Sequence, residues 1–334
     1  MKMRLIVLVL AFSGLCFCCF VYSMVGYWTV KRSVIPTKSL WVVEHLRNIS
    51  SSREKPPDGG GKAEPDLMGA LRHYRSLTNN KTLMLNCSSC AFVSSSGYLL
   101  GHQAGREIDS QDCVIRLNMA PVTGFEKYVG NRTTLRVLNF FLLEVDPASL
   151  PAGSLLLAWG LGMRPAHLKN ATALLARIKD NGSDIYGQSL EGELLVDKVF
   201  AQETGLSLRE THSWISTGWF AMMVALDICR QVHVYGMVPA DYCMMNPKPS
   251  PMPYHYYGQS WIKECATYRK SEVNKNGDHR FMTEKAVFAR WARRYNITFH
   301  YPSWPVSKDS SQSDIDTPFV RLHKSQSFIH WLFH

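Results

Sequence analysis

Residues 87–141 read CSSCAFVSSSGYLLGHQAGREIDSQDCVIRLNMAPVTGFEKYVGNRTTLRVLNFF, and residues 216–238 read STGWFAMMVALDICRQVHVYGMV. Each stretch joins an apolar run to a loop of glycine, serine or threonine. Such loops are typical of places where backbone amides meet a phosphate group, at the end of a strand or the start of a helix. The two stretches together therefore predict one ligand site that is split between distant parts of the chain.

The surrounding sequence predicts an α/β fold with a mainly parallel central sheet, because short apolar runs alternate with longer amphipathic ones. The expected strands are 90–93, 113–117, 135–140, 155–159, 233–238 and 297–300. The expected helices are 167–179, 191–204, 218–229 and 283–294. The helix at 218–229 is apolar nearly all round and has Ser216 or Thr217 as a cap, so we expect it to be buried.

The start of the chain predicts a membrane anchor. Leu5 to Tyr27 hold no charged side chain, and this segment is about long enough for a helix to cross the hydrocarbon core. Lys2 and Arg4 precede it, so residues 1–4 are expected in the cytosol and the rest of the chain in the lumen. A cleaved signal peptide is the alternative, although its apolar region usually has about 7 to 15 residues.

The length of 334 residues fits one domain of roughly 200 to 250 residues with appendages. We place this domain at residues 83–304. Residues 28–82 are rich in proline and glycine near their middle and show no lasting helical or strand period, so we expect a luminal stem there. Residues 305–334 are Ser-rich and polar before they end in an apolar stretch. The sequence leaves open whether this tail is disordered, an appended helix or a transcript variant.

The cysteines predict disulfides. Three of the nine, Cys16, Cys18 and Cys19, lie in the expected membrane span. The other six are an even number in a compartment that permits disulfides; they are Cys87, Cys90, Cys113, Cys229, Cys243 and Cys265. The C-x-x-C at 87–90 is also a possible start of a zinc site, but no second C-x-x-C or His pair at ligand spacing follows. Disulfides are therefore the favoured interpretation.

Two bulk features fit the secretory pathway. Asn-x-Ser/Thr sequons make candidate glycosylation sites of Asn48, Asn80, Asn131, Asn170, Asn181 and Asn296, and a seventh, at Asn86, has Cys as its middle residue. The formal net charge is +10. Nucleic acid is a usual partner of a basic chain, but the predicted topology excludes it, which leaves an anionic small substrate or a solvated basic surface.

Three loops are candidates for ligand binding. SSSG at 94–97 follows an expected strand, where small side chains let the backbone approach a ribose or phosphate. Asn118 follows the next expected strand in the same way. Either loop alone is more often an ordinary turn. STG at 216–218 favours ligand binding over an ordinary turn, because it precedes a helix that is expected to be buried and whose N-terminus favours negative charge.

Both quoted stretches closely resemble the large and small sialyl motifs of animal sialyltransferases. Two shorter sequences follow in the same order as in that family, YHYY at 254–257 and HRFMTE at 279–284. The resemblance covers roughly residues 83–304. It implies a Rossmann-like, GT-A-variant glycosyltransferase domain, held in the lumen of the Golgi apparatus as a single-pass type II membrane protein.

The resemblance also implies that CMP-sialic acid lies between the two loops. The residues implied on the nucleotide and sugar are Ser95, Ser96, Gly97 and Asn118, and those on the cytidine side are Ser216, Thr217 and Gly218. The family often has Asn where this chain has Ser95, and Tyr98 occupies another variable position. A disulfide between Cys90 and Cys229, one from each motif, is implied as well, and the four other luminal cysteines allow three pairings.

The implied chemistry is positioning, charge stabilisation and one proton abstraction. His279, the first residue of HRFMTE, is our candidate for the general base, because an ordinary imidazole pKa of about 6.5 suits a mildly acidic compartment. His255 is the candidate for stabilising the departing phosphate or acting as an acid, with Tyr256 as a supporting residue. Glu284 is expected in the first turn of a helix, where it favours the helix dipole and orients a neighbour or is purely structural.

We expect neither a metal nor another cofactor. Metal-dependent glycosyl transfer usually needs clustered acidic oxygens that bridge a cation to a diphosphate. The only Asp-x-Asp sequence is at 314–316, beyond the expected domain, and a CMP donor carries one phosphate.

Within the family, STGWF, VYGMV, PYHYY and HRFMTEK most resemble the smaller alpha-N-acetylgalactosaminide alpha-2,6-sialyltransferases. This implies inverting transfer of sialic acid to O6 of GalNAc in sialylated Gal-GalNAc of O-glycans or gangliosides. The alternatives are an alpha-2,3-sialyltransferase acting on galactose and a non-catalytic, membrane-anchored glycan-binding protein. The sequence leaves open the choice between glycoprotein and glycolipid, the need for a pre-sialylated acceptor and the oligomeric state.

Overall fold

The computed structural model describes residues 69–139, 150–161, 165–245, 251–274, 277–305 and 315–324. All of these residues belong to one compact unit, residues 64–334. The expected anchor at 5–27, the sequon at Asn48 and residues 28–68 of the expected stem lie outside the described residues. In the part of the chain that is described, no helix has the length and apolar character needed to cross a membrane.

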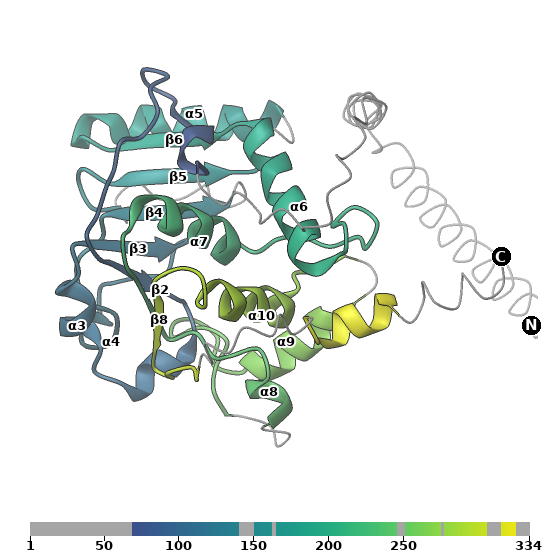
Figure 1. Cartoon of the computed structure of the whole chain (residues 1–334). Coiled ribbons are helices and arrows are strands. Elements are labelled where there is room, and N and C mark those ends of the chain that lie inside the picture. The colour runs from purple at the N-terminus through teal and green to yellow at the C-terminus, as the bar shows by residue number, and fades with distance from the viewer. Residues whose placement is uncertain are drawn as a thin grey trace, which may run out of the picture. The chain divides into compact units, whose positions relative to one another are not determined.

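The described residues form an eight-stranded sheet in the order β1-β6-β5-β4-β3-β2-β7-β8 (Figure 1). Neighbouring strands are parallel except β1 and β6, which are antiparallel. The strands are β1 (Tyr74–Ser76), β2 (Cys90–Val93), β3 (Cys113–Leu117), β4 (Leu135–Asn139), β5 (Leu155–Trp159), β6 (Asp184–Gln188), β7 (Val232–Tyr235) and β8 (Ile297–His300). The α/β class and the mainly parallel sheet agree with the sequence prediction.

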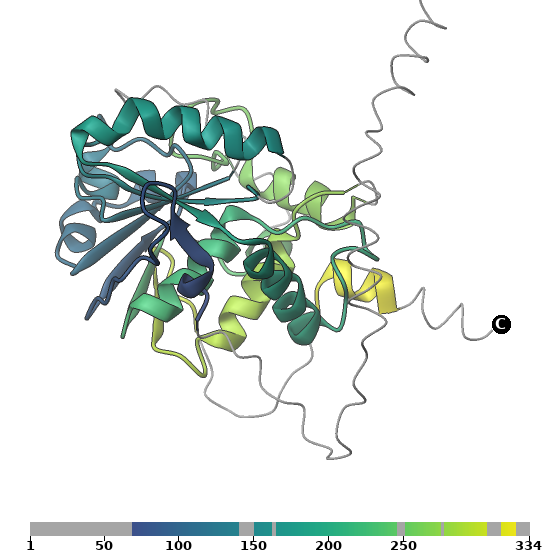
Figure 2. The same ribbon diagram turned by 90° about the horizontal axis from the view of Figure 1, so that it is seen from above.

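Helices cover both faces of the sheet (Figure 2). One face packs against α6 (Leu190–Thr204), α7 (Thr217–Ile228) and α10 (Phe281–Trp291). The other face packs against α5 (Pro165–Ile178) over β4 to β6, and against η2 (Gly97–Gly101), α3 (Gly105–Asp109) and α4 (Glu126–Val129) over β2, β3 and β7. The remaining helices are η1 (Leu71–His73), η5 (Lys179–Asn181), α8 (Tyr242–Met245) and α9 (Glu264–Val273).

The strand order reverses between β2 and β7. The chain runs from β2 outward to β6 on one side, then returns by α7 to place β7 on the other side of β2. In open α/β sheets, ligands bind at the carboxyl ends of the strands on either side of such a reversal. The fold thus marks the loops after β2 and β7 as the place to look for a site.

Helix α7 is the most deeply buried helix that the sequence predicted. Ten of its residues have exposed fractions of 7% or less, and Ser216 caps its N-terminus through its side-chain oxygen. It packs across β2, β3 and β4. The apolar side chains all round the helix are buried, because the sheet lies on one side and α6 and α10 on the other.

Several predicted boundaries need correction. The strand expected at 233–238 ends at Tyr235, because Gly236 has a φ of +77°, which is not an extended conformation. Glycine is required at this position, since a Cβ would lie 2.4 Å from Leu99 Cγ. Strand β6 was not predicted, since its sequence DIYGQ has no apolar run. Strand β1 lies in the expected stem, so the domain begins before residue 83.

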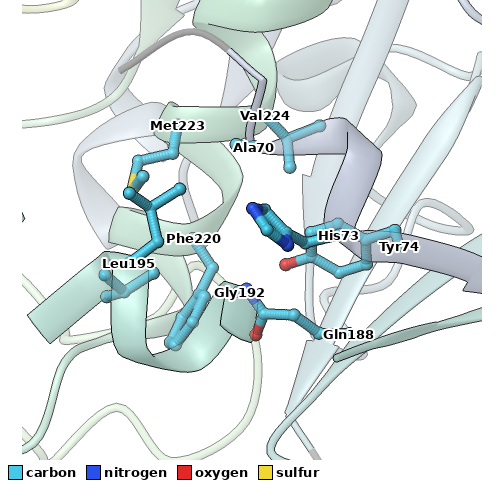
Figure 3. A pocket seen from close by; sticks show the side chains of 10 residues that line it. Ala70, His73, Tyr74, Gln188, Gly192, Leu195, Phe220, Met223 and Val224 are labelled. Atoms are coloured by element: carbon cyan, nitrogen blue, oxygen red, sulfur yellow. The ribbon is translucent and has the colours of Figure 1, made fainter. Parts of the chain in front are cut away.

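The edge formed by η1 and β1 packs on α6 and α7 around a cavity of about 10 Å³ (Figure 3). Tyr74 Oη and Gln188 Oε1 are buried beside it and have no hydrogen-bond partner among the described residues. A space of this size and polarity holds about one water molecule. Burial also raises the pKa of Tyr74 far above its ordinary value.

Three disulfides tie the described domain together. Cys90 is bonded to Cys229, Cys87 to Cys113 and Cys243 to Cys265. The first bond is the one that the family resemblance implied. The sulfurs of Cys87, Cys90 and Cys113 lie within 4.8 Å of one another, but each is already bonded to another sulfur and is not a thiolate ligand.

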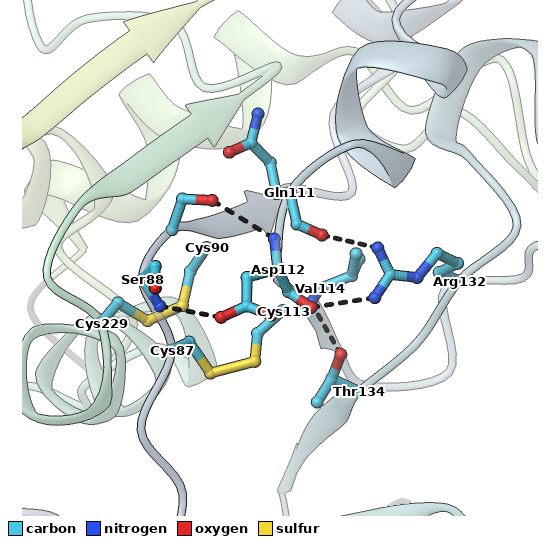
Figure 4. Close-up of a disulfide and its surroundings, with 11 residues drawn as sticks. Cys87, Ser88, Cys90, Gln111, Asp112, Cys113, Val114, Arg132, Thr134 and Cys229 are labelled. Carbon is cyan, nitrogen blue, oxygen red and sulfur yellow. Dashed lines mark hydrogen bonds between the residues drawn. A yellow bond between two sulfur atoms is a disulfide. The ribbon is translucent and has the colours of Figure 1, made fainter.

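Hydrogen bonds between side chains and the backbone surround the Cys87–Cys113 disulfide (Figure 4). Asp112 accepts from the backbone N–H of Ser88 at 2.8 Å, and Arg132 donates to the carbonyl oxygens of Gln111 and Asp112 at 2.6 and 2.9 Å. These contacts fix the starts of β2 and β3 side by side, so the carboxyl ends of both strands are held in register.

Candidate active site

A cavity of about 170 Å³ lies at the carboxyl ends of β2, β3 and β7. It therefore sits at the reversal of strand order, where the topology predicts a ligand. Nine of the residues singled out from the sequence line it: Ser95, Ser96, Asn118, Ser216, Thr217, Gly218, His255, His279 and Glu284. Residues from four separate stretches of sequence are thus brought to one place.

The loop after β2 is held by a second loop, residues 251–263. The Ser95 carbonyl oxygen accepts from the backbone N–H of Tyr256 at 3.0 Å and from His255 Nδ1 at 3.3 Å. The Ser96 hydroxyl donates to the buried carboxylate of Glu264 at 2.6 Å and accepts from the Tyr98 N–H. The Ser96 hydroxyl is consequently used inside the protein.

Gly97 does not line the cavity. Its backbone N–H donates to the Pro253 carbonyl at 3.2 Å, and a Cβ at this position would lie 2.4 Å from that same oxygen. Glycine is needed here for close approach of two backbone segments. Tyr256 is likewise outside the cavity, where its hydroxyl donates to Pro121 O at 2.7 Å and its ring packs on Phe125.

Asn118 connects the two halves of the split site. It adopts a left-handed conformation with a φ of +48°, which Asn tolerates better than most residues. Its Oδ1 accepts from Thr217 Oγ1 at 3.2 Å and from the Asn139 N–H at 3.3 Å. Arg136 Nη1 donates to the Asn118 carbonyl at 2.6 Å and so holds the turn. The side-chain NH₂ of Asn118 is left as a donor for a ligand.

The N-terminus of α7 forms the opposite wall. The N–H groups in the first turn of a helix have no partner within the helix and carry partial positive charge, so they favour an anion. Glu284 in α10 accepts from the backbone N–H of Ser216 at 3.0 Å and from the Ser216 hydroxyl. This buried carboxylate fixes the entrance to α7 to the start of α10.

His279 lies just before α10 and is hydrogen-bonded to the segment that leads into α7. Its Nδ1 lies 3.2 Å from the Trp214 carbonyl oxygen, while the Trp214 N–H donates to the Asp278 carbonyl. Since a carbonyl only accepts, Nδ1 carries the hydrogen and Nε2 keeps a lone pair. Burial lowers the pKa of His279, partly offset by the Trp214 carbonyl and Asp278. The lowered pKa favours the neutral imidazole, in which Nε2 is the atom that can accept a proton.

His255 has the same tautomer, because its Nδ1 donates to the Ser95 carbonyl. Its ring stacks on Tyr257 with centroids 5.0 Å apart. Burial lowers the pKa of His255 as well. This shift favours the neutral imidazole in the ligand-free protein, and a phosphate placed beside Nε2 would raise the pKa of His255 again.

Several residues of the site were not predicted from the sequence. Lys285 lines the cavity, its Nζ lies 3.6 Å from the centroid of the Tyr268 ring, and burial lowers its pKa to about 8. Glu264 is fully buried and bonds Ser96 and Tyr268. Neither residue stands out in the sequence, since both lie in charged helices whose buried face is not apparent. Trp214 beside His279 is 56% exposed.

Among the described residues that line the cavity, Glu284 is the one carboxylate, and Ser216 already occupies both of its oxygens. Asp316 of the Asp-x-Asp sequence does not line the cavity and pairs with Arg321 at 3.4 Å.

The structure also describes most of the predicted glycosylation sites. Asn80, Asn131, Asn181 and Asn296 are exposed, and Asn170 is half-buried.

The chain that forms this site is similar to known proteins. A protein-family model described as Glycosyltransferase family 29 (sialyltransferase) matches residues 63–144 and 194–294. The chain is 40% identical over 244 residues to a Bos taurus protein named alpha-N-acetylgalactosaminide alpha-2,6-sialyltransferase 6, covering 69% of this chain and 73% of that protein.

It is also 38% identical over 255 residues to a Homo sapiens alpha-N-acetyl-neuraminyl-2,3-beta-galactosyl-1,3-N-acetyl-galactosaminide alpha-2,6-sialyltransferase, covering 72% of this chain and 84% of that protein. Among solved structures, a mammalian sialyltransferase in complex with Gal-beta-1-3GalNAc-ortho-nitrophenol is similar at 22% identity with a TM-score of 0.39, covering 64% of this chain and 69% of that chain.

Replacing Glu284 with Gln should reduce the pH dependence of stability. Burial raises the pKa of Glu284 to about 7 from an ordinary 4.5. The folded state therefore holds this proton more tightly than the unfolded state, and the free energy of unfolding falls as pH rises from about 4.5 to about 7. Glutamine does not titrate, yet it keeps an oxygen for the Ser216 N–H.

Thermal unfolding of both proteins at about pH 5 and about pH 7.5 measures the effect. The unfolding temperature of the parent protein should drop more than that of Glu284→Gln. Because Glu264 and Glu272 titrate in both proteins, the difference isolates Glu284. An equal drop in the two proteins would show that Glu284 is ionised at both pH values.

Proposed function

Since this chain belongs to glycosyltransferase family 29, the sialyltransferases, we propose that it transfers sialic acid from CMP-sialic acid to O6 of GalNAc, with inversion at the transferred carbon. The observation that carries the proposal is the meeting of the two loops of the split site in one cavity with His255 and His279. The α/β fold with a mainly parallel sheet supports the Rossmann-like, GT-A-variant class that the resemblance implied.

The donor fits between the loop after β2 and the N-terminus of α7. The helix N-terminus favours the phosphate, and Asn118 lines the same cavity. Many hydroxyls of the two loops already bond other protein groups. The proposed contacts to CMP-sialic acid are therefore backbone N–H groups, the Asn118 amide and the protonated Nε2 of His255, whereas Nε2 of His279 serves the acceptor hydroxyl.

The reaction breaks the bond between the anomeric carbon of sialic acid and the phosphate oxygen of CMP. The bonding pair leaves with CMP, and an acceptor hydroxyl oxygen forms the new bond on the opposite face of the carbon. His279 Nε2 takes the hydroxyl proton, since Trp214 holds Nδ1–H in place. His255 lines the same cavity; it takes up a proton from solvent when the anionic donor binds, and its Nε2–H then donates to the phosphate oxygens as negative charge grows on them.

The acceptor is proposed from the names of the relatives. These relatives are named alpha-2,6-sialyltransferases of GalNAc, one of them for sialylated galactosyl-GalNAc. The exposed indole of Trp214 borders His279 and offers an apolar face to a sugar ring. An alpha-2,3-sialyltransferase acting on galactose is the second candidate within the family.

Location and cofactors are part of the same proposal. We place the chain in the Golgi membrane as a single-pass type II protein, with residues 5–27 as the anchor and the domain in the lumen. The three disulfides and the exposed sequons support a secretory glycoprotein. No cofactor or metal is proposed, because a donor with one phosphate and a carbohydrate acceptor meet the needs of the reaction.

Replacing His279 with Ala should lower kcat by about 100-fold or more, the range expected for loss of a general base. The dissociation constant for CMP should stay within a few-fold, because the phosphate contacts come from other residues. Steady-state kinetics and CMP titration measure the two quantities. His102→Ala is the matched control, since His102 does not line the cavity. Turnover near that of the control would remove His279 from the mechanism.

Acceptor preference tests the subfamily assignment. The luminal domain should add sialic acid to O6 of GalNAc, preferably when the attached galactose already carries alpha-2,3-linked sialic acid. Matched assays use Gal-GalNAc and its sialylated form on aryl and ceramide carriers, with linkage analysis by mass spectrometry. Transfer to galactose O3, or clear preference for the unsialylated disaccharide, contradicts the assignment. CMP binding without transfer to any acceptor favours the glycan-binding alternative.

A further inference from the structure

Residues 315–324, here called the C-terminal segment, are built into the domain although the family match ends at residue 294. Residues 318–324 are helical and lie beside α9 (yellow in Figure 1). Thr317, Phe319 and Val320 are each no more than 2% exposed. Phe319 and Val320 belong to the same apolar core as α6, α7 and α10. Residues 315–324 are therefore part of the packed domain, although they lie in the tail that the sequence left unassigned.

The first contact of the C-terminal segment is with Arg280, the residue after His279. The guanidinium of Arg280 lies 4.7 Å from the centroid of the Phe319 ring. It also donates to Ser213 Oγ at 2.8 Å, to the Ser271 carbonyl at 2.5 Å and to the Asn274 carbonyl at 2.8 Å. The hydrogen bonds fix the edge of the guanidinium, and the aromatic ring covers one face of it.

The second contact is a chain of hydroxyls. Thr317 Oγ1 lies 2.6 Å from Thr283 Oγ1, and Thr283 Oγ1 donates to Glu272 Oε1. Because a hydroxyl has one hydrogen, Thr317 is the donor to Thr283. The other oxygen of Glu272 accepts from the Met282 N–H at 3.0 Å. The C-terminal segment thus contacts the chain one and four residues after His279.

His279 itself is held from the same side. Its carbonyl oxygen accepts from Ser271 Oγ at 2.6 Å, and Ser271 also supplies its carbonyl to Arg280. None of the residues of the C-terminal segment lines the cavity that His279 lines. If the C-terminal segment affects the reaction, it therefore does so through the position of His279.

We propose that the C-terminal segment is a positioning element for His279: Phe319 and Thr317 brace Arg280 and Thr283 from behind and so set the direction of the His279 imidazole. The inference rests on the proposed role of His279 as the base. Displacement of a reacting group by about 1 Å costs up to roughly 100-fold in rate, so loss of the brace should appear in turnover rather than in donor binding.

The test uses conservative variants of the full luminal domain. Thr317→Val removes the hydroxyl at nearly constant volume, and Thr317→Ser restores it. Phe319→Leu keeps an apolar side chain but removes the ring face from Arg280. Arg321→Ala is the control, because Arg321 is exposed on the same short helix and pairs there with Asp316.

We expect Thr317→Val and Phe319→Leu each to lower kcat by roughly 10-fold or more, with the KM for the donor and the dissociation constant for CMP within about 2-fold. Thr317→Ser and Arg321→Ala should match the parent protein. Unchanged kcat in both test variants overturns the proposal. It is also overturned if the apparent kcat falls only in proportion to the fraction of protein that still binds CMP, because that pattern reports stability alone.

A second measurement does not depend on transfer activity. NMR titration of the His279 imidazole reports its pKa in the parent protein and in Phe319→Leu. Burial lowers this pKa, and Asp278 and Arg280 are the charged groups that face the ring. A loosened loop exposes the ring, so the pKa should rise toward 6.5 in Phe319→Leu and stay unchanged in Arg321→Ala. If the parent protein shows no sialyl transfer but the pKa shifts in this way, the brace stands and the proposed function fails; an unchanged pKa in Phe319→Leu overturns the brace.

Discussion

The bond between Cys90 and Cys229 is the constraint on which the geometry of the site depends. It joins the first residue of β2 to Cys229, the residue directly after α7. The strand leads away from this bond, and the helix arrives at it, so the carboxyl end of β2 and the N-terminus of α7 lie on the same side. At that end Thr217 bonds Asn118, and Glu284 bonds Ser216. Two segments more than a hundred residues apart in the sequence thereby form one cavity.

The side chains around the cavity mostly bind one another. Ser96 is held by Glu264, Ser216 by Glu284, and Thr217 by Asn118 and Trp159. These bonds fix the loops before a ligand arrives, which is the arrangement that makes electrostatic stabilisation effective, because little reorganisation is needed during reaction. Burial also lowers the pKa of His255 and of His279, which favours the neutral imidazole with a lone pair at Nε2.

The sequence predicted the parts of the fold whose pattern is strong and local. Strands β2, β3, β5 and β8 are continuous or alternating apolar runs and were placed at the bounds that the structure has. The polar strand β6 and the three-residue β1 carry no such pattern, because their stability comes from pairing within the sheet. The motifs also located the cavity residues, but they did not reveal that Gly97 serves backbone approach to Pro253, or that Lys285 and Glu264 lie beneath the loops. Those roles depend on contacts between distant segments, as does the burial of Phe319.

Hydrogen exchange in the presence of CMP tests most directly whether the two loops form a single nucleotide site. Peptides that cover residues 94–98 and 216–220 are compared with and without CMP, and UMP serves as the control nucleotide. If the two loops form one nucleotide site, CMP protects both segments over the same range of CMP concentration, and UMP protects them less. Protection of one segment alone, or of neither at a CMP concentration that saturates binding, would show that the two loops do not form one site.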